Sequence, residues 1–150
     1  MASECPVALV KIDEYQVRVL ALIVTLTAAT YIWSDSVWLL ALLCYDFTVR
    51  TLGVSQGSPI FLISRVITAR LPFTAKPVDA GPKKFAAKIG FLFVTTALLL
   101  ALAGYASSAL WLMGLMTVFA LLEAACGFCV GCKLYALLPR FLRESKRCYQ

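Results

Sequence analysis

The sequence predicts an all-α membrane protein, and three observations lead to this class. Of the 150 residues, 61% are hydrophobic and 15% are charged, whereas soluble proteins carry about 25% charged residues. The mean hydropathy of +0.85 indicates more apolar surface than a soluble fold of this length can bury. No charged residue occurs from 89 to 122, a stretch that suits two membrane spans and a turn. We therefore expect a single membrane domain, 1–150, with four transmembrane helices.

The first two spans are expected at about 19–34 and 37–54, on either side of a tight turn at Asp35. Asp13 is a candidate cap for the first helix, because its carboxylate can accept from free amide groups at a helix start. In the second span, Asp46 and Arg50 lie four residues apart, share a helix face and can pair. We favour a position in the lipid headgroup layer for both side chains.

After the second span, a short helix is expected at 59–71. It carries apolar residues and two arginines and suits the membrane interface. The next segment, 72–88, contains prolines and lysines and is expected to be a solvated loop. The third and fourth spans are expected at about 89–104 and 109–138, followed by a basic cytoplasmic tail, 139–150.

The basic residues all fall on one side of this arrangement. The turns near Asp35 and Ser107 contain no Lys or Arg, so the positive-inside rule places both termini and the middle connection in the cytoplasm. The first ten residues lack a basic region and an apolar core, so no cleavable signal peptide is expected. The net charge of +6 is then explained by the membrane topology and by contact with the lipid bilayer, which is the expected partner. No nucleic-acid partner is expected.

Three cysteines in one short segment are the candidate functional residues: Cys126, Cys129 and Cys132. The cytosol keeps thiols reduced, so a Cys-x-x-Cys pair there favours redox, sulfur-carrying or metal-binding roles. Our leading hypothesis is a dithiol, Cys129 and Cys132, that relays electrons or sulfane sulfur. Because Cys129 would precede a short helix from about 130 to 138, its pKa is expected to be the lower of the two.

Glu123 is expected to support this dithiol by taking or giving a proton. No basic residue lies within nine positions of it, so we expect it to be protonated or paired with a group on another span. Cys126 or Cys5 would be the resolving or receiving thiol. Whether such activity makes the protein an enzyme stays open at this point, and no cofactor is indicated.

Three other interpretations remain open. Cys126 and Cys5 could complete a zinc site, because zinc prefers four ligands and two on one segment make half a site. The cysteines could instead pack as small apolar residues, with Gly127 and Gly131 permitting close helix contact. A third interpretation is a small transporter, in which Asp46 and Glu123 line a path.

The segment 124–135, Ala-Ala-Cys-Gly-Phe-Cys-Val-Gly-Cys-Lys-Leu-Tyr, resembles the signature of a bacterial membrane family catalogued as domain of unknown function 4395. The resemblance extends to Ile12-Asp13 and Arg18, and to the segment 81–90 before the third span. It implies a small multi-span protein of the bacterial inner membrane, sometimes found alongside thioredoxin-like or rhodanese-like proteins. It implies no established activity.

Overall fold

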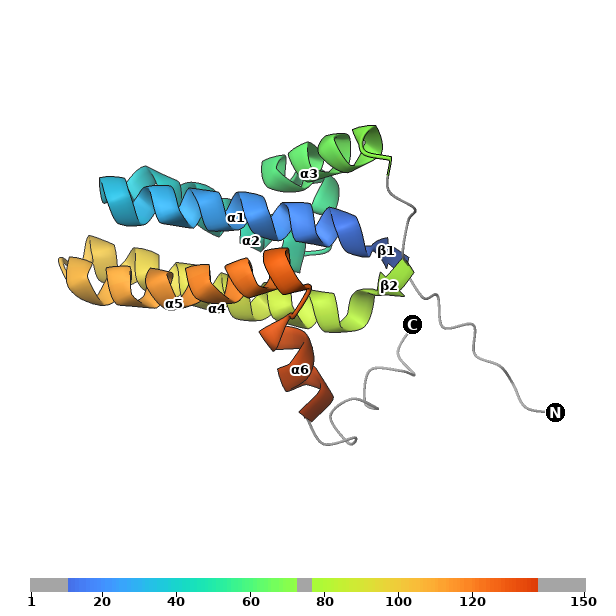
Figure 1. Ribbon diagram of the computed structural model, residues 1–150. Helices are drawn as coiled ribbons and strands as arrows, with labels where there is room; N and C mark the ends of the chain where they lie inside the picture. The colour runs from blue at the N-terminus through green and yellow to red at the C-terminus, as the bar shows by residue number, and fades with distance from the viewer. Residues whose placement is uncertain (1–10, 73–76, 138–150) are drawn as a thin grey trace.

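The computed structural model describes residues 11–72 and 77–137, and these form a helical bundle (Figure 1). Two very short strands precede two of the helices. The elements are, in chain order, β1 Lys11–Asp13, α1 Glu14–Ser34, α2 Val37–Thr51, a 3₁₀ turn Ser55–Gly57, α3 Pro59–Arg70, β2 Pro77–Asp79, α4 Ala80–Leu102, α5 Ala106–Cys126 and α6 Val130–Leu137.

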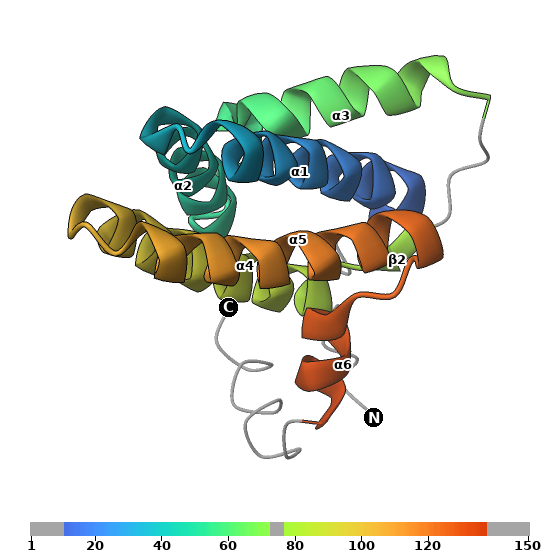
Figure 2. The same cartoon turned by 60° about the vertical axis from the view of Figure 1, so that its left-hand side comes forward.

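The four longest helices run back and forth and pack as α1 on α5, α2 on α4, and α4 on α5 (Figure 1). β1 and β2 pair antiparallel, with Ile12 opposite Val78, and so place the starts of α1 and α4 side by side. α3 lies on the outside of α1, whereas α6 packs on α4 and turns away from the bundle (Figure 2). We call the end with β1, β2 and α6 the ribbon end, and the opposite end the turn end.

Within the described residues, three helical segments are long and apolar enough to cross a membrane. They are Glu14–Ser34, Pro82–Leu102 and Ala106–Cys126, each with 21 residues. α2 is shorter, with 15 residues. The expected helical class is therefore confirmed, and three of the helices have the length and composition of membrane spans.

The start of α1 agrees with the capping prediction at Asp13. Asp13 accepts a hydrogen bond from the Tyr15 amide at 3.1 Å, which satisfies one of the free donors at a helix start. Glu14 and Arg18 then pair at 2.6 Å across the first turn. The helix therefore begins at Glu14, as the cap predicted, ahead of the membrane span expected from residue 19. Its end is as expected, because Asp35 adopts a left-handed conformation with φ of 50°.

The expectation of a loop over 72–88 is wrong in its second half. α4 begins at Ala80, directly after β2. Pro82 lies in the first turn, where a helix does not use the missing amide hydrogen and the fixed φ of proline is suitable. Lys83, Lys84 and Lys88 therefore lie on a helix.

The single span expected at 109–138 is also wrong, because it consists of two helices. α5 ends at Cys126, and Gly127 adopts a φ of 67° that favours glycine. The Gly127 amide closes the helix by donating to the Glu123 carbonyl at 3.0 Å. α6 begins at Val130, in agreement with the short second helix that the dithiol hypothesis requires. The tail after residue 137 lies outside the described residues.

The contact between α6 and α4 depends on a small residue on each helix. A Cβ on Gly131 would lie 2.7 Å from the Ala86 Cβ and 2.8 Å from the Ala86 Cα. The rings of Phe85 and Tyr135 meet beside this contact, with centroids 5.5 Å apart. The close packing expected at Gly131 is therefore confirmed.

We expect Gly131→Ala to loosen α6, because the clashing atoms belong to Ala86 backbone and Cβ and cannot rotate away. Overpacking of this kind costs about 1–3 kcal/mol. Cys129 should then be alkylated faster, since its residue is only 7% exposed when α6 is docked. Rates for each cysteine can be followed by mass spectrometry.

Gly114→Ala is the matched control, because a Cβ on that helical glycine would meet no atom within 4 Å. Adding Ala86→Gly to Gly131→Ala should restore part of the protection of Cys129. An unchanged alkylation rate in Gly131→Ala would contradict the docking role of this contact.

Candidate functional site

Side chains from three helices form a polar cluster at the ribbon end. Lys83 lies near the start of α4, Glu123 near the end of α5, and Cys129 and Cys132 at the start of α6. Lys83 Nζ donates a hydrogen bond to Glu123 Oε1 at 2.7 Å. The two side chains are 17% and 18% exposed, so water screens this ion pair less than a surface pair. The cluster therefore combines one ion pair with two thiols.

The start of α6 brings the two thiols together. The Cys129 carbonyl accepts from the Lys133 amide at 3.1 Å, so Cys129 occupies the position just before the helix. Cys132 follows one turn later, on the same side of the helix, so each thiol affects the pKa of the other. Both cysteines are free, with Cys129 buried and Cys132 half-buried.

The expected order of thiol acidity is reversed in the structure. The hydrogen bond with Cys132 and burial raise the pKa of Cys129. The hydrogen bond from the Cys129 thiol lowers the pKa of Cys132, and the positive charge of Lys83 acts in the same direction against burial. The sequence argument considered only the helix start, whereas the less exposed thiol serves as donor and the one nearer water carries the negative charge more readily.

Cys126 does not join this cluster. It is the last residue of α5 and its side chain is exposed. Cys5, the other candidate for a resolving thiol or a zinc ligand, lies outside the described residues. Within 11–72 and 77–137, no three His, Cys, Asp or Glu side chains lie close enough together to hold a metal ion.

Lys83 is the functional residue that the sequence argument missed. It was assigned to a solvated loop, yet it is the partner of Glu123 on another helix. The expectation that Glu123 pairs across the bundle is confirmed. Two signals pointed to Lys83: Pro82 suits a helix start, and the segment 81–90 belongs to the family resemblance.

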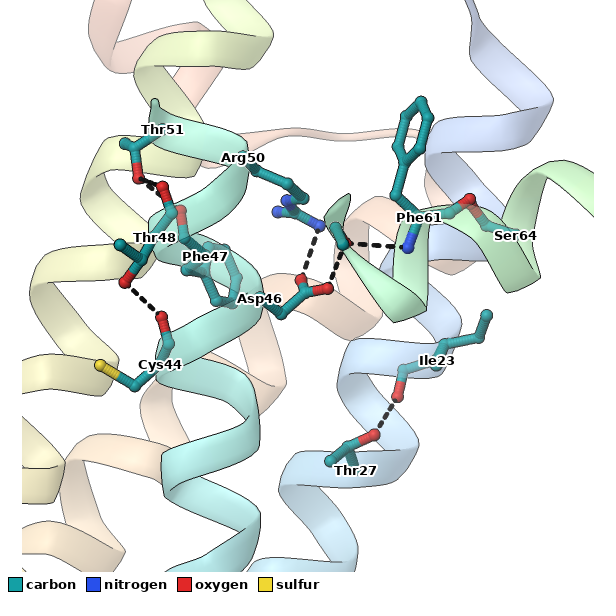
Figure 3. Close-up of polar contacts among 11 residues, drawn as sticks. Ile23, Thr27, Cys44, Asp46, Phe47, Thr48, Arg50, Thr51, Phe61 and Ser64 are labelled. Atoms are coloured by element: carbon teal, nitrogen blue, oxygen red, sulfur yellow. Dashed lines mark hydrogen bonds and ion pairs between the residues drawn. The ribbon is translucent and has the colours of Figure 1, made fainter. Parts of the chain in front are cut away.

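A second polar cluster joins α2 to α3 (Figure 3). Asp46 is fully buried inside the protein and accepts a hydrogen bond from the Ser58 hydroxyl. Ser58 in turn caps α3 by accepting from the Phe61 amide at 3.0 Å. Arg50 lies on the same face of α2, with its Nη1 3.5 Å from Asp46 Oδ2. The pairing of Asp46 with Arg50 that the spacing allowed is thus present, and the carboxylate also fixes the start of α3. The favoured position of both side chains in the headgroup layer is wrong, because the protein itself buries them.

The two acids considered for a transport path belong to different clusters. Asp46 contacts Arg50 and Ser58, whereas Glu123 contacts Lys83. Each carboxylate is therefore neutralised by a base of its own, and the two do not form a carboxylate pair.

The comparison with protein families agrees with this architecture. Residues 12–140 match the family model described as Domain of unknown function (DUF4395). The chain belongs to this family. The match spans both polar clusters and every element from α1 to α6, and it confirms the resemblance found in the sequence. No curated protein and no solved structure matches the chain.

In this DUF4395 protein we expect Lys83→Met to raise the pKa of Cys132, because the variant removes a positive charge that favours the thiolate. Alkylation of Cys132 should then require a higher pH. The measurement is the pH dependence of the iodoacetamide reaction, followed at each cysteine by mass spectrometry.

Lys88→Met is the matched control, since Lys88 is an exposed lysine of the same helix. Adding Glu123→Gln to Lys83→Met should partly restore the native pH dependence of Cys132 alkylation, because the charge of Glu123 opposes ionisation of Cys132. Identical profiles in Lys83→Met and the native protein would exclude Lys83 from the thiol site.

Proposed function

We propose that the chain is a small membrane protein whose Cys129–Cys132 dithiol exchanges electrons with a thiol protein at one membrane edge. The observation that carries the proposal is the asymmetry of the two thiols. Cys129 is buried and has a raised pKa, whereas Cys132 is half-buried and has a lowered pKa beside Lys83. An exchange reaction needs this difference, because one thiolate attacks first and the second thiol follows.

The reaction starts when the Cys132 thiolate attacks a disulfide of the partner. A mixed disulfide forms with Cys132, and one partner sulfur leaves as a thiolate. Cys129 then loses its proton to water or buffer and attacks the Cys132 sulfur. The Cys129–Cys132 disulfide forms, and the second partner sulfur leaves as a thiolate. Two electrons have moved from the dithiol to the partner, and protons from solvent neutralise the two leaving thiolates.

A thioredoxin-like protein suits this chemistry, because it carries a disulfide of its own near the surface. A rhodanese-like partner would instead deliver a sulfane sulfur to Cys132 and leave a persulfide there. The two cases differ in the product on Cys132, either a mixed disulfide or one added sulfur atom, and both use the same thiolate.

We expect Cys129→Ser to trap the first intermediate. With oxidised glutathione as the partner disulfide, a stable glutathione adduct should accumulate on Cys132, because no second thiol is available for its release. The native protein should instead reach the internal disulfide. Intact-protein and peptide mass spectrometry distinguish the two products.

Cys132→Ser is the matched control. Its adduct should form much more slowly at the pair, because the remaining thiol of the pair, Cys129, is buried and has a raised pKa. Equal adduct formation in both variants would contradict the assigned roles. If the native protein forms neither an adduct nor an internal disulfide, the exchange function is wrong.

We further propose that four helices span the inner membrane of a bacterium, with α2 as the fourth and the dithiol on the cytoplasmic side. The turn end carries exposed Trp33, Trp38 and Trp111, which suit a membrane–water interface. The turns at 34–37 and 102–106 contain no Lys or Arg, whereas α3, α6 and the start of α4 carry several. α2 covers about 22 Å and needs the flanking residues or a locally thinner bilayer.

This topology predicts the labelling of single cysteines placed in a background without native cysteines. Cysteines introduced as Ser34→Cys and Ser107→Cys should react with an impermeant maleimide in intact cells. One introduced as Lys84→Cys, at an exposed position of α4, should react only after the membrane is opened. Labelling of the Lys84→Cys variant in intact cells would reverse the orientation.

A further inference from the structure

A cavity of about 180 Å³ lies between the helices at the ribbon end, next to the thiols. Side chains of α1, α2, α4 and α5 form most of its wall, with contributions from α3 and α6. Most of these side chains are apolar, among them Leu20, Val24, Phe47, Phe93, Met116 and Phe119. The dithiol chemistry makes no use of this space.

Arg50 is the unusual residue of this wall. Its side chain is only 11% exposed, and its guanidinium lies 4.5 Å from the centre of the Phe47 ring. Nη1 faces Asp46 Oδ2 at 3.5 Å, and neither of these two buried atoms has a hydrogen-bond partner in the described part of the chain. A guanidinium carries five N–H donors, and a buried donor without an acceptor costs free energy. Arg50 Nη1 therefore has a long ion-pair contact with Asp46 and no full hydrogen bond among the described residues.

Besides Arg50, the charged groups of the wall sum to one positive charge. Lys83 and Glu123 neutralise each other, and Lys84 adds a further positive charge near the surface. Asp46 contacts Arg50 and is not part of the wall. An occupant of the cavity thus meets an apolar surface, a buried guanidinium and few acceptors.

We propose that this cavity binds a small organic anion, with an apolar body of about one aromatic ring and one carboxylate. The carboxylate accepts hydrogen bonds from the Arg50 guanidinium, whose planar fork matches it. The ring contacts the apolar wall. The expected size of the anion follows from the cavity volume, because an apolar cavity of about 150 Å³ holds a benzene molecule. The proposal does not depend on the dithiol reaction.

The test uses the full-length protein in an uncharged detergent, with benzoate, benzyl alcohol and acetate as probes in a calorimetric titration. Benzoate should bind saturably. Benzyl alcohol keeps the ring and lacks the charge. Its affinity should be lower by a factor of about ten or more, as expected for the loss of one charge-assisted hydrogen bond. Acetate, which lacks the ring, should also bind more weakly. Equal binding of benzoate and benzyl alcohol would overturn the anion site.

Two variants test the two parts of the site. Asp46→Asn with Arg50→Met removes both charges together, and an asparagine can still accept from Ser58, so α3 keeps its anchor. Benzoate binding should fall about tenfold or more in this variant, with benzyl alcohol unchanged. Ala120→Leu fills the wall and should weaken both probes, whereas Ala103→Leu, at an exposed position of the turn end, should weaken neither.

Unchanged benzoate binding in the Asp46→Asn/Arg50→Met variant would show that Arg50 does not hold the anion and would overturn the proposal. Cys129→Ser/Cys132→Ser keeps the wall intact, so it should bind benzoate as the native protein does. A failure of the exchange reaction and a failure of anion binding can therefore be observed separately.

Discussion

The ion pair between Lys83 and Glu123 is the interaction on which the ribbon end depends. It joins the start of α4 to the end of α5 at 2.7 Å. The same two side chains act on the thiols of α6 and form part of the cavity wall. In an apolar environment a single charge at either position would be costly, whereas the pair is tolerated because each group supplies the counter-charge of the other. Both candidate regions therefore share this one contact between two helices.

The direction of α6 follows from backbone geometry at two glycines. Gly127 takes the left-handed conformation that ends α5, and Gly131 lets α6 approach Ala86 more closely than a side chain would permit. The Arg18 guanidinium also lies against Gly127, within 3.0 Å of the place where a Cβ would be. A cation at this place is favourable, because the last carbonyls of a helix carry partial negative charge. The thiols are thus held at the edge of the bundle by α1, α4 and α5 together.

Much of the fold could be predicted from the sequence, because hydrophobic runs and turn residues carry local information. The cap at Asp13, the turn at Asp35 and the break at Gly127 were all expected from residue type. The start of α4 was missed because lysines in a row resemble a solvated loop, and only the pairing of β2 with β1 shows that the chain is already ordered there. The acidity of the two thiols was also predicted in the wrong order. Lys83 determines it in part, and Lys83 is 49 residues before Cys132 in the sequence.

The buried charges lie towards the ribbon end, and this restricts the chemistry that the bundle can support. Asp46 and Arg50 lie in the last two turns of α2, and Lys83 and Glu123 lie near the start of α4 and the end of α5. Towards the turn end the core is built from Leu40, Val94, Ala97 and similar residues. A charged molecule entering from the ribbon end would meet partners only in this region, since deeper burial would leave its charge unpaired. The proposed anion binding and the proposed thiol exchange would therefore share one edge of the protein.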